Sequence, residues 1–153
     1  MYGSEIVVRE LQDLAQRIAD NIARNGQTAS GKTARSLEVR EGSDEVTLLG
    51  RKAFHTMETG TPPLGDKIKL KSFAAILYRW SQDKGISFDN DRERWSFAFQ
   101  VAQKIKAEGT QLFRDSGRAD VYSNEMPKTI DNIARKLADE VVMKFETIKL
   151  NRK

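Results

Sequence analysis

The corner formed by Gly60, Thr61, Pro62 and Pro63 constrains the fold of this chain more than any other stretch. Glycine adopts positive φ at little steric cost, and Thr61 is biased toward extended backbone because a proline follows it. The two prolines have no backbone N–H to donate, so the segment that leaves the corner cannot enter the interior of a sheet. The sequence therefore predicts a stiff corner, with the acidic residue Glu58 just before it.

Glu58 has two interpretations. As a structural group it would accept hydrogen bonds from backbone N–H groups around the corner, or pair with Arg35 or Arg51. As part of a catalytic pair it would orient His55, which lies three residues earlier and shares a helical face with it. Because no nucleophile is specified and a lone histidine beside a glutamate is more often structural, we prefer the structural interpretation and expect no enzymatic activity.

Four segments place apolar side chains at three- and four-residue spacing, which predicts helices. The predicted helices cover residues 5–24, 72–84, 92–108 and 127–149. Asn25-Gly26 is a stop signal for the first helix, Ser4 and Ser72 are expected N-caps, and residues 89–91 are expected to form a capping turn. One apolar seam is expected to pack along the last helix: Ile130, Ile133, Leu137, Val141, Phe145 and Ile148.

Residues 36–49 are expected to form a β-hairpin, since apolar and polar residues alternate on both sides of a turn at residues 41–44. Lysines alternate with apolar residues over residues 67–71, which predicts a third strand or an extended arm. These lysines would guard an exposed sheet edge or, alternatively, contact DNA phosphates or an acidic partner. The predicted fold is α+β: a small antiparallel sheet packed with four helices in a single domain, residues 1–153.

The composition limits the chemistry that the chain can carry. It has 153 residues, no cysteine and one histidine, which excludes disulfides, thiolate metal sites and a multi-histidine site within one chain. We expect no metal, no cofactor, no signal peptide and no membrane contact, and we expect synthesis in a cytoplasm. The net charge of +4 permits contact with DNA or an acidic partner without requiring either.

Residues 26–33 match the phosphate-loop pattern G-x-x-x-x-G-K-[ST] in full. A working phosphate loop needs a buried strand before its first glycine and a helix after the Lys-Thr pair, so that backbone N–H groups point at the phosphates. Asp20, Asn21, Arg24 and Asn25 instead lie on a polar helical face, and residues 34–39 turn toward strand-like alternation. We interpret the match as a flexible loop, and a nucleotide-binding protein is kept as an alternative function.

Residues 109–126 form the longest stretch without periodicity. Phe113, Val121 and Tyr122 are poorly suited to a loop that stays in water, while the charges at Arg114 and Asp120 would be costly to bury unpaired. We expect this segment to be mobile or to order against a neighbouring protein, and not against its own core.

Two motifs in this chain resemble the tail-completion (minor tail, head–tail joining) family of tailed double-stranded DNA phages. The first, Gly-x-Leu-x-x-Ser-Ile-like, is matched by Gly31, Arg35, Ser36 and Leu37, with Thr33 where a leucine is usual. The second, Tyr-Ala-x-x-x-Glu-x-Gly-Thr-like, is matched by Ala53, Glu58, Gly60 and Thr61, with Lys52 where an aromatic residue is common. The resemblance covers residues 5–65, and the remainder matches by architecture.

The resemblance implies a structural subunit that forms a ring of six or twelve copies in the head–tail connector (neck) or completes the tail. It implies a virion protein whose partners are copies of itself, other connector or tail proteins and, in passing, packaged DNA. A DNA-binding accessory protein is the second alternative function. The residues expected to serve structure and assembly are Gly31, Arg35, Ser36, Glu58, Gly60, Thr61, Pro62, Phe113 and Tyr122.

Overall fold

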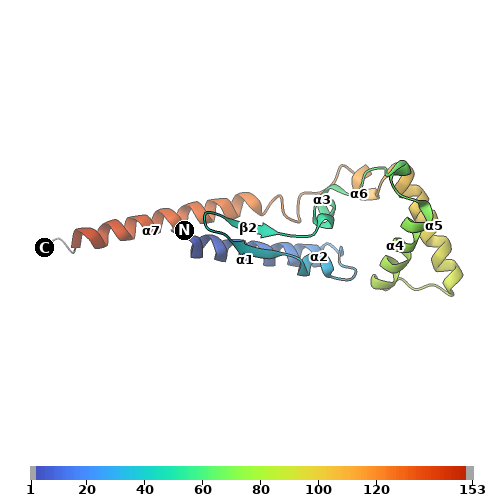
Figure 1. Ribbon diagram of the computed structural model, residues 1–153, viewed down its shortest axis with the longest axis horizontal. Helices are drawn as coiled ribbons and strands as arrows, with labels where there is room; N and C mark the ends of the chain where they lie inside the picture. Colours follow the sequence, from blue (N-terminus) through green and yellow to red (C-terminus); the bar gives the residue numbers. More distant parts are fainter. Residues whose placement is uncertain (1–2, 151–153) are drawn as a thin grey trace.

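The computed structural model describes residues 3–150 and has an α+β fold with a two-stranded antiparallel sheet. Figure 1 shows an elongated molecule, with one long helix running out to the C-terminus at one end and a helical hairpin at the other. The long helices are α1 (Ser4–Arg24), α4 (Leu70–Asp83), α5 (Asp91–Glu108) and α7 (Met126–Leu150). They confirm the four predicted helices. None of the helices among residues 3–150 is both long enough and apolar enough to cross a bilayer.

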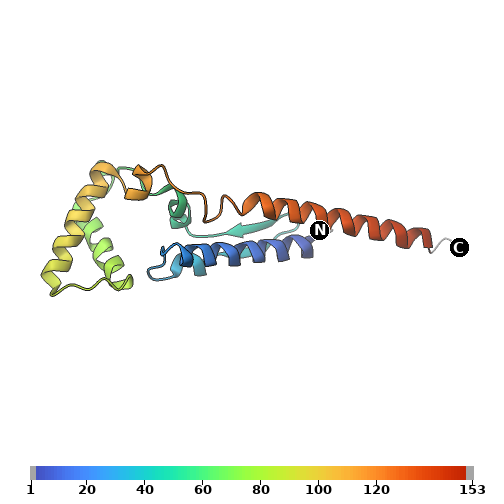
Figure 2. The same cartoon turned by 180° about the vertical axis from the view of Figure 1, so that it is seen from behind.

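The sheet and the main core are built on α1. Strand β1 (Glu38–Glu41) pairs with β2 (Val46–Leu49), with Val39 opposite Leu48, which confirms the predicted hairpin. The hairpin lies along α1, and α7 runs beside α1 on another side (Figures 1 and 2). The core of this body consists of buried side chains from α1 and the segment before α7: Leu14, Ile18, Ile22 and Val121.

Helices α4 and α5 pack on each other around a second, separate cluster, formed by Ala74, Ala98 and Ala102. Small side chains at these positions let the two helix backbones approach closely, and the aromatic rings of Tyr78 and Trp95 stack at 4.4 Å beside them. As predicted, residues 89–91 cap α5: Asn90 accepts the backbone N–H of Glu93 at 3.0 Å. Gly85 follows the end of α4 with φ +73°.

The third strand expected near residues 67–71 is not formed. Residues Gly65–Lys67 make a short 3-10 helix, η2, and α4 begins at Leu70. Leu70 packs against the alanine cluster of α4 and α5, so it follows the helical period of α4 and not a strand alternation. Ser72 is therefore inside the first turn, and the N-cap is Lys69, which makes no side-chain cap.

Two expectations at the ends of the long helices are corrected as well. Helix α1 begins at Ser4, and its N-cap is Gly3 in the left-handed region (φ +73°) with no side-chain cap. The seam of α7 is buried only in part, because α1 contacts one side of α7 and leaves Ile130 60% exposed. Ile133 and Leu137 are half-buried, whereas Val141 and Phe145 are exposed; the side chain of Ile148 lies outside the described residues. The predicted stop at Asn25-Gly26 is confirmed, with Gly26 at φ +66°.

The connecting segments hold four more short helices. These are α2 (Lys32–Arg35), η1 (Lys52–Phe54), α3 (Thr56–Thr59) and α6 (Gln111–Arg114). Helix α3 and the corner after it lie next to α6, between the body and the α4–α5 hairpin (Figure 1). This junction holds the predicted corner and most of the predicted site residues.

Candidate functional site

The corner at Gly60 has no room for a side chain. Gly60 ends α3 with φ +69°, a conformation that strongly favours glycine. A Cβ atom there would lie 2.4 Å from the backbone nitrogen of Phe113 and 2.7 Å from Oγ1 of Thr110. The chain therefore requires glycine at residue 60 both for its backbone conformation and for the close approach of α6.

The corner is held by the segment that follows α5. Thr61 donates its backbone N–H to the Thr110 hydroxyl at 2.9 Å, and the N–H of Thr110 donates to the Thr61 carbonyl at 2.9 Å. Gly109 and Gly117 flank this contact with positive φ, and a Cβ on either would lie 2.7 Å from the carbonyl oxygens of Thr61 and Glu58, respectively. The two segments cross so closely that their backbones touch.

Glu58 closes the contact on its other side. Its Oε1 accepts the backbone N–H groups of Val121 at 3.0 Å, Tyr122 at 2.6 Å and Ser123 at 2.9 Å. Its Oε2 accepts the hydroxyl of Ser123, and its backbone carbonyl accepts the N–H of Arg118 at 2.9 Å. Glu58 is only 4% exposed. We call residues 58–61, together with the residues of 109–123 that they contact, the corner clasp.

The environment of Glu58 keeps it ionised. Burial alone would raise its pKa, but hydrogen bonds from the Ser123 side chain and from the backbone N–H groups of residues 121–123 outweigh burial and hold the pKa below its usual value. A carboxylate that already accepts four hydrogen bonds is a poor proton acceptor for a substrate. Glu58 therefore serves to hold residues 121–123 in place by hydrogen bonds.

Tyr122 covers the clasp with an aromatic contact. Its ring centroid lies 4.8 Å from that of Phe54, and its hydroxyl lies 3.4 Å from Nδ1 of His55. Burial and the negative charge of Glu58 raise the pKa of Tyr122. The alternative pairing of His55 with Glu58 is not formed, because the carboxylate bonds to residues 121–123 while His55 faces Tyr122.

The predicted site residues fall into two groups. Glu58, Gly60, Thr61, Phe113 and Tyr122 meet in the corner clasp, and Pro62 is exposed just outside it. The other group is at α2: Gly31 has φ +73°, Nη2 of Arg35 donates to the Ser30 carbonyl at 2.8 Å, and Ser36 links two loops. The Ser36 hydroxyl donates to the Thr33 carbonyl at 2.7 Å and accepts the N–H of Arg51 at 3.0 Å.

Two expectations about the clasp are wrong. Glu58 bonds neither to the corner backbone nor to Arg35 or Arg51, since its acceptor atoms are taken by residues 121–123. The segment 109–126 does order against its own core: Val121 is fully buried beside Leu14, Ile18 and Ile22. Of its large apolar residues, Phe113 (40% exposed) and Met126 (45% exposed) remain exposed.

Several residues of the clasp were not singled out from the sequence. They are Gly109, Thr110, Gly117 and Ser123. The two glycines at positions 109 and 117, on either side of a short stretch that holds Leu112 and Phe113, are the sequence signal for two tight turns. The signal for Thr110 was its place as the N-cap of α6, where it accepts the N–H of Phe113.

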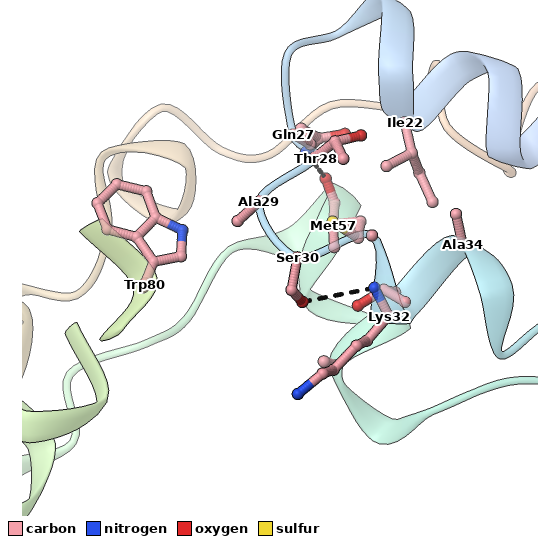
Figure 3. Close-up of a pocket in the computed structure, with 12 residues that line it drawn as sticks. Ile22, Gln27, Thr28, Ala29, Ser30, Lys32, Ala34, Met57 and Trp80 are labelled. Carbon is pink, nitrogen blue, oxygen red and sulfur yellow. Dashed lines mark hydrogen bonds between the residues drawn. The ribbon is translucent and has the colours of Figure 1, made fainter. Parts of the chain in front are cut away.

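The phosphate-loop-like stretch lines a pocket of about 220 Å³, shown in Figure 3. Helix α1, and not a strand, precedes its first glycine, and α2 after it is only four residues long. The side chain of Lys32 extends away from Gln27 and Thr28 in Figure 3. The strand–loop–helix frame that would aim N–H groups at a phosphate is not present in residues 4–41.

Within residues 3–150, no group of three or more acidic or histidine side chains is placed to hold a metal ion. No protein-family model matches the sequence, and no curated protein and no solved structure matches it either. The resemblance to phage tail-completion proteins therefore depends on the motif residues in α2, α3 and the corner.

Proposed function

We propose that this chain is a non-enzymatic structural subunit of a tailed-phage particle. In this proposal it forms a homo-oligomeric ring in the head–tail connector or completes the tail, and it contacts other connector or tail proteins. The two motifs that carry the resemblance support this proposal, because the residues of both motifs hold the fold together. Gly31 and Ser36 form the turn into the hairpin, and Glu58, Gly60 and Thr61 form the corner clasp.

One observation carries the assembly part of the proposal. The distal part of α7 extends past the start of α1 (Figure 1), and several of its apolar side chains are exposed. Val142 is 56% exposed, Met143 67% and Phe145 63%. A group of large apolar side chains on a projecting helix is costly for a subunit that stays alone, and such groups mark interaction sites. The anchoring role of Glu58 also favours a structural subunit over an enzyme.

The mass of the assembled particle in solution tests this function. We expect sedimentation or mass photometry to show particles whose mass is a multiple of six of the 17.3 kDa subunit. Electron microscopy of these particles should show closed rings. A chain that remains monomeric at every accessible concentration and salt would contradict the homo-oligomeric function.

A further inference from the structure

The net positive charge of this protein is concentrated on the α4–α5 hairpin and the segment that leads into it. Residues 64–107 contain nine lysines and arginines against five acidic residues, so they carry the whole net charge of +4. The rest of the chain has as many acidic residues as lysines and arginines. A surface with an excess of one sign of charge attracts a partner of the opposite sign.

Three lysines of this region have no partner in their own chain. Lys67 ends η2, Lys69 is the N-cap of α4, and Lys71 is in the first turn of α4. All three are exposed, and their side chains make no hydrogen bond within residues 3–150. None of the ion pairs formed in that part of the chain involves residues 64–107. We call residues 67–71 the lysine segment.

The fold removes the simplest explanation for this row of lysines. Lysines on an exposed edge strand prevent sheets from pairing edge to edge. The lysine segment forms no strand, because η2 ends at Lys67 and α4 begins at Leu70. Protection of a sheet edge therefore does not account for these charges.

The backbone presents the lysines in a row. Ile68 (φ −137°, ψ 138°) and Lys69 (φ −68°, ψ 133°) are extended, and Lys106 of α5 holds the row in place by donating to the Ile68 carbonyl at 2.5 Å. Residues two apart in an extended chain lie about 7 Å apart. Phosphates follow one another about every 3.4 Å along the axis of each strand of a DNA duplex, so each lysine can contact a different phosphate.

The charges that surround the lysine segment are also mostly positive. The segment is next to the last turns of α5, where Lys104 is exposed. Asp66 is the one acidic residue within residues 64–71 and 103–107, which hold five lysines. Glu108, at the end of α5, pairs with Arg114 at 3.3 Å. The local charge therefore favours an anionic partner.

The composition of this surface favours phosphates over an acidic protein. Interfaces between proteins are poor in lysine and depend on buried aromatic and apolar anchors. None of the large apolar side chains that are exposed within residues 3–150 belongs to residues 62–75. Contact with a phosphate backbone needs only point charges such as lysine ammonium groups.

The same observation favours a duplex over a single strand. Proteins that bind single strands stack the bases on exposed aromatic side chains. Phe73, the aromatic residue next to the lysine segment in sequence, is half-buried against the alanine cluster of α4 and α5. A duplex keeps its bases stacked inside and its phosphates outside, which suits a row of lysines without an aromatic platform.

We propose that the lysine segment binds the phosphate backbone of a nucleic-acid duplex without reading its bases. Helix α4 lies at the end of the molecule opposite the C-terminal end of α7 (Figures 1 and 2). The contact is therefore separate from the exposed apolar side chains of α7. It goes beyond the structural function proposed above and does not depend on it.

The salt dependence of binding to a fluorescent DNA duplex tests the proposal. Each phosphate contact contributes about 0.9 to the slope of log K against log salt concentration. Changing Lys67, Lys69 and Lys71 together to glutamine should make this slope shallower by about 2.7 or more, and should weaken binding about tenfold or more at low salt. Changing the same three residues to arginine should preserve the slope, because the charges remain.

A matched control separates this site from net charge. Arg24, Lys32 and Lys52 are three exposed cations outside residues 64–107, and changing them together to glutamine removes the same charge. This control variant should keep the wild-type slope. Circular dichroism melting should show that every variant folds, and mass photometry should show that the lysine-segment variants assemble as the wild type does. A duplex RNA of equal length, titrated in parallel, shows which duplex the segment prefers.

Four results would overturn the proposal. The wild-type chain binds no duplex at low salt, or the glutamine variant of the lysine segment keeps the wild-type slope. The control variant loses as much of the slope, so that net charge alone matters. A single strand or polyglutamate binds more tightly than the duplex, which would favour base stacking or an acidic protein partner.

Discussion

The carboxylate of Glu58 accepts the backbone N–H of Tyr122 at 2.6 Å, across 64 residues of sequence. This bond joins the corner after α3 to the segment that leads into α7. Because Val121, next to Tyr122, is buried in the core of α1, the same bond fixes the corner to the main body. The clasp therefore sets where the α4–α5 hairpin leaves the body, since both of its connecting segments pass through it.

Replacing Glu58 with alanine should destabilise the fold by about 3 kcal/mol or more. The change would leave three backbone N–H groups and the Ser123 hydroxyl without their acceptor in a buried place. Urea unfolding at pH 7 measures the loss. Glu41→Ala is the control, since Glu41 is exposed on the hairpin and its loss should change the free energy of unfolding by less than about 0.5 kcal/mol.

Stability should fall on acidification, and Glu58 should account for part of the fall. Its pKa lies below the ordinary value of 4.5, so the unfolded chain takes up this proton at a higher pH than the folded chain. The contribution is therefore complete above about pH 5.5 and is lost as the pH drops through the folded pKa. Glu10, whose pKa is lowered chiefly by its hydrogen bond to Lys136, adds a loss of the same sign.

The comparison with Glu58→Gln isolates the share of Glu58 in this loss. The glutamine variant should be less stable at pH 7 but should lose less free energy of unfolding between pH 7 and pH 3. It should retain the acid sensitivity due to Glu10. Parallel pH profiles for the wild type and the variant would show that Glu58 has no lowered pKa.

Gly60→Ala should cost about 3 kcal/mol or more. An alanine at φ +69° and ψ −176° is strained by about 1–3 kcal/mol, and its Cβ would also collide with the Phe113 backbone. Gly85→Ala is a matched control, because Gly85 has φ +73° and no atom within 4 Å of the added Cβ. A larger loss for Gly60→Ala than for Gly85→Ala reports the collision together with the strain that the ψ of −176° adds at Gly60, and equal losses would mean that α6 moves aside.

The helices and the hairpin could be predicted from sequence because their signals are local. Apolar residues recur with a period of 3.6 in each helix and of 2 in each strand. Asn25-Gly26 ends α1 and Asn90 begins α5, and both act on residues next to them in the sequence. The prediction of a third strand at residues 67–71, made as an alternative to an extended arm, was wrong. Five alternating residues cannot distinguish a strand from the start of a helix at Leu70. Leu70, Phe73 and Leu77 recur at helical spacing, and this longer pattern prevails in the fold.

Of the corner clasp, the sequence predicted the corner itself but not the partners of Glu58. The sequence showed a glycine-dependent corner with an acidic residue, but the partners of Glu58 lie more than 60 residues away and depend on how α7 packs on α1. Segment 109–126 is ordered by backbone hydrogen bonds to the corner and by the burial of Val121, and not by a helical or strand-like apolar face. Such hydrogen bonds leave no periodic pattern in the sequence from which they could be predicted.

Amide exchange should show that the clasp is ordered in the free subunit. The N–H groups of Val121, Tyr122 and Ser123 are held by Glu58 and should exchange slowly before any assembly. Exposed amides of the hairpin turn near Ser43 should exchange fast in the same sample. Fast exchange of residues 121–123 in the monomer, with protection only on assembly, would instead support a segment ordered by a partner.

Lys32→Ala should change neither stability nor assembly, and ATP should not raise the melting temperature of the wild-type chain. The loop before Lys32 follows a helix, Lys32 is exposed, and α2 is only four residues long, so few N–H groups converge on one point. A ligand at a hundred times its Kd would stabilise the folded chain by about 2.7 kcal/mol, which a thermal shift detects easily. A shift with millimolar ATP that Lys32→Ala abolishes would contradict this prediction and would favour the nucleotide-binding alternative.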